Sequence, residues 1–251
     1  ISPKIGISYH CTPEFETYAS ISRGYQSGGF NVSNDTEAGA KFNPSHSWHY
    51  EAGAKTKWLE ERFLVNAAIF YTDTHNYQVY QLNSTDPSQA FLVNADRVSS
   101  YGAELDMMAR PCENLDLSAA FGVTQTEFDR FTDKTGTKFD GNDVNFVPEF
   151  TASLAVQYRF PKNIYARVEY QAVGNYFLDE ANTAEQSAYG LLNARVGYEH
   201  EHFEIYVFGK NLLDKHYVNN ALDLRNAFQT DLLIRQPGDP MTVGVAFSAS
   251  F

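Results

Sequence analysis

Apolar and polar residues alternate along most of this chain with the two-residue period of a β-strand. In the last eleven residues, 241–251, large apolar side chains share one face, small or polar side chains share the other, and the segment stops at Phe251. The segment 48–58 alternates in the same way between Trp48 and Trp58. About ten residues at ~3.4 Å each, tilted by ~40°, rise roughly 25 Å, the height of the apolar band of a membrane barrel. The pattern therefore predicts strands that cross a membrane.

About eleven such strands follow one another, and the connections between them alternate between short and long. Short turns are expected at residues 11–14, 59–61, 111–114, 161–163 and 200–202. Long polar connections are expected at residues 23–47, 81–97, 131–148, 174–186 and 217–240. This alternation is typical of outer-membrane barrels, in which the short turns face the periplasm and the long loops face the exterior. We therefore expect an all-β fold, a transmembrane antiparallel β-barrel.

Charged residues lie on the face opposite the large apolar ones. Phe150, Ala152 and Leu154 share one face of a predicted strand, whereas Glu104 and Arg159 belong to the opposite set. An Arg or Lys on the lipid face would cost ~2 to 4 kcal/mol near the membrane midplane. The polar face is therefore expected to line a lumen filled with water or protein.

The strand count predicts that the chain is one part of a larger barrel. Single-chain bacterial barrels have an even number of strands. The last strand must run toward the periplasm, and counting back across ten connections makes the first strand, 3–10, run the same way. Residues 1–251 are therefore expected to form the C-terminal half of a barrel, completed by a companion chain or segment.

Composition agrees with this class and argues against others. Mean hydropathy is −0.40 and aromatic residues make up 15% of the chain, as expected when every second strand residue faces a polar lumen. No apolar run approaches the ~18 residues that a spanning helix needs. The formal net charge of −12 argues against a nucleic-acid partner, because phosphates would be repelled.

No motif predicts catalysis or a resident metal. The sequence lacks G-x-S-x-G, H-E-x-x-H and a glycine-rich phosphate loop, so we do not expect an enzyme. His200 and His202 are a weak metal pair in a short turn with no third ligand nearby. Asp133, Asp140 and Asp143 crowd one long connection but lack the register of a dedicated calcium loop. We expect solvated polar segments at both places.

Three segments resemble motifs of TonB-dependent outer-membrane receptors. The segment 211–217, NLLDKHY, resembles N-L-F-D-K-x-Y, and the segment 22–31, SRGYQSGGFN, resembles S-K-G-Y-K-x-G-G-F-N of siderophore receptors. The segment 237–242, PGDPMT, is similar to the closing G-x-P-R-T, with Met241 in place of the usual Arg. Together with the spacing of the segments 50–53 and 101–104, these motifs most resemble the ferric yersiniabactin and pesticin receptor group. The resemblance spans essentially the whole chain.

The resemblance implies a 22-stranded barrel around an N-terminal plug, of which this chain supplies strands twelve to twenty-two. It implies TonB-dependent uptake of a ferric siderophore across a Gram-negative outer membrane, with TonB, ExbB and ExbD acting through a plug that this chain lacks. The siderophore holds the iron, so no intrinsic cofactor and no protein metal ligand are expected. Haem or cobalamin as the ligand, and a passive porin or adhesin-type barrel, are the alternatives.

Aromatic and guanidinium groups in the long connections are the candidate ligand site. Flat aromatic faces and planar cations suit an aromatic, oxygen-rich, net negative chelate. Some of these aromatic residues would instead belong to the interfacial girdle. The leading candidates are Tyr25, Gln26, Phe30, Tyr80, Tyr176, Arg225 and Arg235. The wider set adds Phe42, His46, Phe91, Arg97, Phe139, Phe177, Tyr217 and Phe228.

Overall fold

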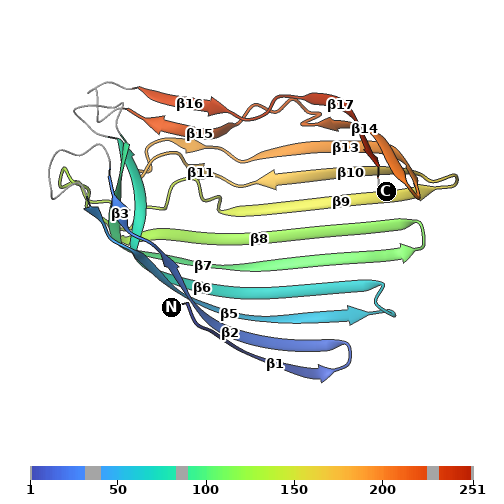
Figure 1. The fold of residues 1–251 in the computed structure, drawn as a ribbon, viewed down its shortest axis with the longest axis horizontal. Helices are drawn as coiled ribbons and strands as arrows, with labels where there is room; N and C mark the ends of the chain where they lie inside the picture. Colours follow the sequence, from blue (N-terminus) through green and yellow to red (C-terminus); the bar gives the residue numbers. More distant parts are fainter. Residues whose placement is uncertain (1, 32–40, 83–89, 225–231, 250–251) are drawn as a thin grey trace.

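A single antiparallel sheet of eleven strands forms the body of the molecule. The computed structural model describes residues 2–31, 41–82, 90–224 and 232–249. No helix in this part of the chain is long and apolar enough to cross a membrane. Each strand pairs with its neighbour in the chain (Figure 1), which confirms the predicted antiparallel meander. The order is β1 (Lys4–Thr12), β2 (Phe15–Gln26), β5 (Ser45–Trp58), β6 (Phe63–Leu82), β7 (Ala90–Cys112), β8 (Leu115–Arg130), β9 (Phe150–Phe160), β10 (Ile164–Val173), β13 (Tyr189–His200), β14 (Phe203–Lys210) and β17 (Thr242–Ala249).

Short and long connections separate to the two ends of the sheet, as the sequence predicts. The five short turns lie at one end, hereafter the turn end, and the long connections lie at the other, hereafter the loop end (Figure 1). In the residues that the structure describes, the long connections contain three small two-stranded sheets. These pair β3 (Gly29–Phe30) with β4 (Lys41–Phe42), β11 (Tyr176–Phe177) with β12 (Glu185–Gln186), and β15 (Val218–Asp223) with β16 (Leu233–Pro237).

The β6–β7 hairpin corrects one predicted loop. Residues 81–97 were expected to be a long connection, but the two strands remain paired from Tyr77 with Ala95 up to Leu82 with Ala90. The alternation changes face at Asn76, which has a φ of +55°, and opposite it Asp96 and Arg97 are both exposed. Because the two-residue alternation is interrupted here, the sequence pattern did not predict that the strand continues. Above the break, the hairpin turns away from the sheet and rises toward β15 and β16 (Figure 1).

The two faces of the sheet differ in chemistry. One face presents exposed apolar side chains such as Ile69, which is 64% exposed, Leu154 and Val245. The other face carries ion pairs: Asp116 accepts a hydrogen bond from Arg110 Nε at 2.7 Å and pairs with Arg159 as well. An exposed apolar face is stable where the surrounding medium is lipid.

The hydrophobic core lies at the loop end rather than in the sheet. Its larger cluster, hereafter the cap core, packs the raised part of the β6–β7 hairpin against the connection that follows β8. Three phenylalanines stack in series there, with ring centroids 5.0 Å apart for Phe128 and Phe131 and 5.2 Å apart for Phe131 and Phe139. The cap core comprises Val79, Phe91, Val93, Ala95, Val98, Phe128, Phe131, Phe139 and Val144.

The two cysteines are both exposed and belong to different hairpins at the turn end. Cys11 is the penultimate residue of β1 and Cys112 is the last residue of β7, and these strands are four steps apart in the sheet order. At ~4.8 Å per strand the separation is roughly 19 Å, whereas a disulfide needs Cα atoms within about 7 Å. We expect two thiols to be alkylated per chain when the purified protein is labelled without a reductant. A cross-linked peptide pair in a non-reduced digest would contradict this strand order.

Candidate functional site

A cavity of about 890 Å³ opens at the loop end of the sheet. Residues 77–81 and Phe91 of the β6–β7 hairpin line one side, and residues 220–223 of β15 line another. The connection after β8 and the turn that contains Leu178 and Glu180 complete the lining. Four segments distant in sequence therefore meet around one space.

The wall after β8 is a well-defined turn. The Asp133 carboxylate accepts hydrogen bonds from the backbone N–H groups of Thr135 at 2.8 Å and Thr137 at 2.9 Å, and Gly136 supplies the left-handed residue with a φ of +87°. The turn holds Lys134 Nζ 3.9 Å from the centre of the Phe91 ring. This geometry is a cation–π contact, which places a positive charge at the cavity edge.

The β15–β16 wall is supported from below by buried polar groups. Tyr176 is only 8% exposed, and its hydroxyl donates a hydrogen bond of 2.5 Å to the carbonyl of Val218. The backbone N–H of Val218 donates to Gln186 Oε1 at 2.8 Å. Leu178 and Ala184 pack beside Tyr176 in the second hydrophobic cluster. Tyr176 therefore supports the wall of the cavity and does not line it.

The described lining carries more acids than bases. Asp133, Glu180 and Asp223 contribute carboxylates, whereas Lys134 is the cation in this part of the lining. Burial, reinforced by the nearby charges of Asp223, Asp179 and Asp133, raises the pKa of the Glu180 carboxyl. Burial also lowers the pKa of Lys134. Near neutral pH, Glu180 is therefore protonated more often than an exposed glutamate, and its protonated form both donates and accepts hydrogen bonds.

Tyr80 is the one leading candidate among the described residues that lines the cavity, where it is 66% exposed. Phe91 and Phe139, from the wider set, line it as well. Arg235 lies between Ile234 and Gln236, and these two neighbours line the cavity while Arg235 does not.

The other candidates lie elsewhere in the molecule. Tyr25 and Gln26 end β2, and Phe30 is exposed in β3. Tyr25 is on the same face as Ile21, which is the apolar outer face of the sheet. Arg225 and Phe228 lie outside the described residues.

Sequence reasoning missed Lys134, Glu180 and Asp223. Each stands in a different long connection, so no motif or period links them. The available signal was the recurrence of charged residues near the middle of those connections. Among the described residues, no group of three or more His, Cys, Asp or Glu side chains could hold a metal ion.

The segment 22–31 attaches the end of β2 to the raised hairpin. The Asn31 side chain donates to the carbonyl of Leu92 at 2.9 Å, and the backbone N–H of Leu92 donates to Asn31 Oδ1 at 2.8 Å. The side-chain amide thus pairs with the hairpin edge as a neighbouring peptide group would. Gly28 packs so closely that a Cβ there would lie 2.6 Å from the Phe42 carbonyl oxygen. This motif therefore positions the cavity wall.

The segment 211–217 fixes the connection between β14 and β15. Asn211 is 3% exposed and its side-chain nitrogen donates to the carbonyls of Lys215 and Asp239, each at 3.0 Å. Its side-chain oxygen accepts from the N–H of Lys215 at 2.9 Å. Tyr217 stacks on Tyr189 with ring centroids 4.5 Å apart. One buried amide thus joins both ends of the last long connection.

Known proteins resemble this chain in sequence or in fold. A metal-pseudopaline receptor, CntO, of Pseudomonas aeruginosa is 27% identical over 192 residues, which cover 76% of this chain and 25% of the relative. The structure of the ferric yersiniabactin uptake receptor FyuA from Yersinia pestis superposes with a TM-score of 0.81 at 24% identity, covering 99% of this chain and 37% of that one. The siderophore receptor PiuA from Acinetobacter baumannii superposes with a TM-score of 0.75 at 19% identity, covering 97% of this chain and 35% of that one. The chain thus spans a quarter to about a third of the length of these relatives.

Residues 1–212 match a protein family that is described as "TonB dependent receptor-like, beta-barrel". The match covers most of the eleven-stranded sheet and contains the motif at 22–31, whereas it ends at the start of the segment 211–217. Proteins of this family lie in the outer membrane, where the apolar outer face of the sheet contacts lipid. The chain therefore belongs to the family of TonB-dependent receptor β-barrels.

Proposed function

We propose that this chain forms the C-terminal eleven strands of an outer-membrane receptor that takes up a ferric siderophore in a TonB-dependent manner. The remaining strands and a plug come from a companion chain or segment, and TonB, ExbB and ExbD act through that plug. The observation that carries the proposal is the cavity at the loop end, which combines aromatic side chains with charged ones. The yersiniabactin and pseudopaline receptors named above support the choice of a metal chelate as the ligand.

The charges of the lining suggest which part of the chelate faces this wall. Asp133 and Asp223 accept hydrogen bonds, and Glu180 does so in either protonation state. A region of the chelate that carries amine, amide or hydroxyl donors fits these groups better than a bare carboxylate. The iron stays within the chelate, so the protein supplies no ligand to it.

Gln236 and Arg235 offer a matched pair for testing this site. They are adjacent on β16, and Gln236 lines the cavity whereas Arg235 does not. We expect Gln236→Trp in the full-length receptor to reduce affinity for its ferric siderophore at least tenfold, because the added indole occupies ligand volume. Arg235→Trp should leave affinity within about twofold. The measurement is binding of radiolabelled chelates to whole cells.

The outcomes of this experiment separate the alternatives. If Arg235→Trp weakens binding and Gln236→Trp does not, the ligand binds on the other side of the β15–β16 hairpin. If uptake of the labelled chelate continues in cells that lack TonB, the barrel acts as a passive porin and the proposed function is wrong.

A further inference from the structure

A second cavity, hereafter the wall pocket, lies on the inner face of the sheet. Its volume of about 670 Å³ is within the range of small-molecule sites. The strands β10, β13 and β14 supply most of its lining, which includes Arg167, Arg195, Tyr206, Phe208, Lys210 and Tyr217. Val196 and Val207 are exposed on the outer face, so Arg195 and Phe208, which alternate with them, face the lumen.

The start of β15 separates the wall pocket from the cavity at the loop end. Tyr217 lines the wall pocket, whereas residues 220–223, a short way along the chain, line the loop-end cavity described above. Tyr217 is fixed by its stack on Tyr189 and by Gly238, where a Cβ would lie 2.0 Å from the Tyr217 ring. The wall pocket is therefore on the lumen side of the loop-end cavity.

The two cavities differ in charge. The described lining of the loop-end cavity carries more acids than bases, whereas that of the wall pocket has three cations and two carboxylates. These are Arg167, Arg195 and Lys210 against Glu169 and Asp239. One Glu169 oxygen accepts a hydrogen bond from Arg167 at 3.0 Å, and the other accepts one from Gln171 at 2.6 Å. Asp239 is the remaining carboxylate, and in the described part of the chain it forms no ion pair with Arg195 or Lys210.

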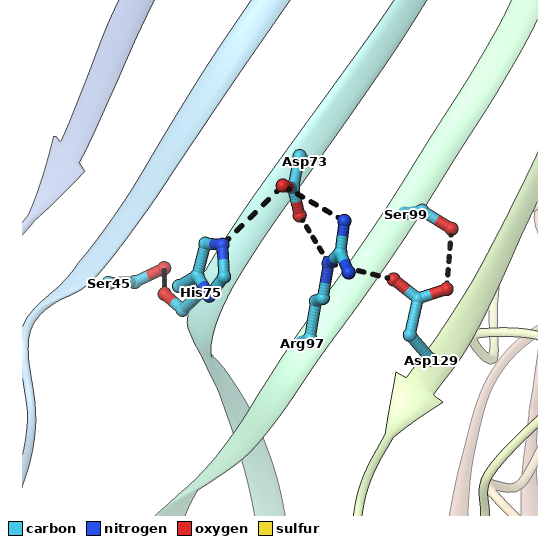
Figure 2. A network of polar contacts seen from close by, with 6 residues as sticks. All are labelled: Ser45, Asp73, His75, Arg97, Ser99 and Asp129. Atoms are coloured by element: carbon cyan, nitrogen blue, oxygen red, sulfur yellow. Dashed lines mark hydrogen bonds and ion pairs between the residues drawn. The ribbon is translucent and has the colours of Figure 1, made fainter.

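A paired arginine elsewhere in the sheet shows what Arg195 lacks. Arg97 Nε donates to one Asp73 oxygen at 2.8 Å, and its terminal NH2 nitrogen donates to the other at 3.2 Å (Figure 2). Asp129 and Ser99 extend that network. Arg195 Nε, by contrast, is buried without a hydrogen-bond partner among the described residues. A buried donor without an acceptor is unfavourable, so an acceptor from outside this part of the chain completes the surroundings of Arg195.

Aromatic rings position the two cations that lack a carboxylate partner. The central carbon of the Arg195 guanidinium lies 5.5 Å from the centre of the Tyr165 ring and 5.6 Å from that of the Tyr206 ring. Lys210 is two residues from Phe208, the cross-strand partner of Arg195, and its Nζ lies 5.8 Å from the Phe208 ring. A planar guanidinium that is held in place, with a second cation nearby, suits a carboxylate.

We propose that the wall pocket is a second ligand site, which binds an aromatic carboxylate or phenolate group, the anionic part of the chelate. This inference rests on the proposed function, because it takes the chelate as the molecule that reaches the lumen. The acid-lined cavity at the loop end fits the donor groups of the chelate, whereas Arg195 and Lys210 fit its anionic oxygens. The Tyr206 and Phe208 rings offer flat faces to an aromatic ring in the same pocket. A carboxylate of the companion segment is the other source of such a group, and the test separates the two.

The test measures the binding of benzoate to the full-length receptor in detergent, by ligand-observed NMR titration. Benzoate carries the aromatic ring and the carboxylate, and benzamide is its neutral counterpart of similar shape. We expect the parent to bind benzoate at least tenfold more tightly than benzamide, because only the carboxylate pairs with the cations. Arg195→Met with Lys210→Met should weaken benzoate binding at least tenfold. Arg195→Lys should keep only part of the affinity, because an ammonium lacks the planar fork.

Arg62→Met with Lys162→Met is the matched control. Both residues are exposed at the turn end, and this variant loses the same two charges. It should bind benzoate within about twofold of the parent, and heat-modifiable migration on gels verifies that each variant is folded. Equal benzoate affinity in the parent and in the folded Arg195→Met/Lys210→Met receptor would overturn the proposal. Equal affinity of the parent for benzoate and benzamide would overturn it as well.

A second measurement identifies the source of the anion. If a carboxylate of the companion segment fills the pocket, benzoate should not bind the parent. Arg195→Met/Lys210→Met should then sensitise cells to vancomycin, because the loosened segment opens the lumen, and this outcome would overturn the assignment to the chelate. We expect vancomycin sensitivity to stay at the level of the parent. Neither measurement involves TonB or uptake, so failure here is distinguishable from failure of the proposed function.

Discussion

Replacing Asn211 with alanine should destabilise the closing hairpin of the sheet more than any other single polar substitution that we propose. The buried Asn211 side chain makes three hydrogen bonds, and its loss leaves the N–H and C=O of Lys215 and the C=O of Asp239 without those partners. Each such hydrogen bond contributes ~0.5 to 1.5 kcal/mol. The φ of +48° at this position also suits asparagine better than alanine. We expect a loss of about 3 to 6 kcal/mol in the free energy of unfolding.

The measurement is the urea midpoint of heat-modifiable migration for the full-length receptor in detergent. Asn211→Asp should show a smaller loss, because the carboxylate still accepts the Lys215 N–H while the two donated bonds disappear. Asn220→Ala is the matched control, since Asn220 is exposed on β15. A midpoint for Asn211→Ala equal to that of Asn220→Ala would show that the buried amide does not hold the hairpin.

Replacing Phe131 with alanine should open the cap core while the sheet remains folded. Phe131 is 0% exposed and lies between the rings of Phe128 and Phe139. Removing a buried phenylalanine ring costs about 3 to 5 kcal/mol. About 3 kcal/mol corresponds to roughly a hundredfold increase in the open population. We expect trypsin to cleave after Lys134 or Lys138 about a hundred times faster, and chelate affinity to fall with it.

Phe121→Ala provides the control for the same strand. The Phe121 ring is on the outer face of β8, 45% exposed, and does not belong to the cap core. Its loss should leave the cleavage rate at Lys134 unchanged. If Phe131→Ala also abolishes heat-modifiable migration, then the cap core and the sheet unfold together. That result would contradict the prediction that the sheet stays folded when the cap core opens.

The sequence was informative about the sheet because each strand repeats the same rule. Membrane strands must bury one face in lipid and expose the other to a polar lumen, so alternation marks them regardless of tertiary contacts. The outward row from Tyr50 to Ala54 and the turn at 59–61 follow directly from that rule. The family motifs at 22–31 and 211–217 are also local, and their roles follow from hydrogen bonds within or near the segment.

The structure of the cap core was less predictable from the sequence, because it depends on contacts between distant segments. The β6–β7 hairpin continues past Asn76 with its faces exchanged, a change that only the tertiary packing of Val79 and Phe91 explains. The same limitation affected the candidate site. Tyr25 was assigned to a loop because β2 was expected to end earlier, whereas three further residues of alternation place it on the outer face. Tyr176 has the aromatic character of a ligand residue but supports β15 from below.

The cap core and the apolar outer face are both hydrophobic, yet they respond differently to temperature. The cap core removes side chains such as Phe128 and Val98 from water, so its stability carries the heat-capacity signature of the hydrophobic effect. That driving force weakens on cooling. Side chains such as Ile69 contact lipid, so their burial does not depend on the hydrophobic effect of water in the same way. The sheet beneath them is held by backbone hydrogen bonds with which no water competes. Cold therefore loosens the cap core at the loop end, whereas the membrane-facing sheet keeps its rigidity.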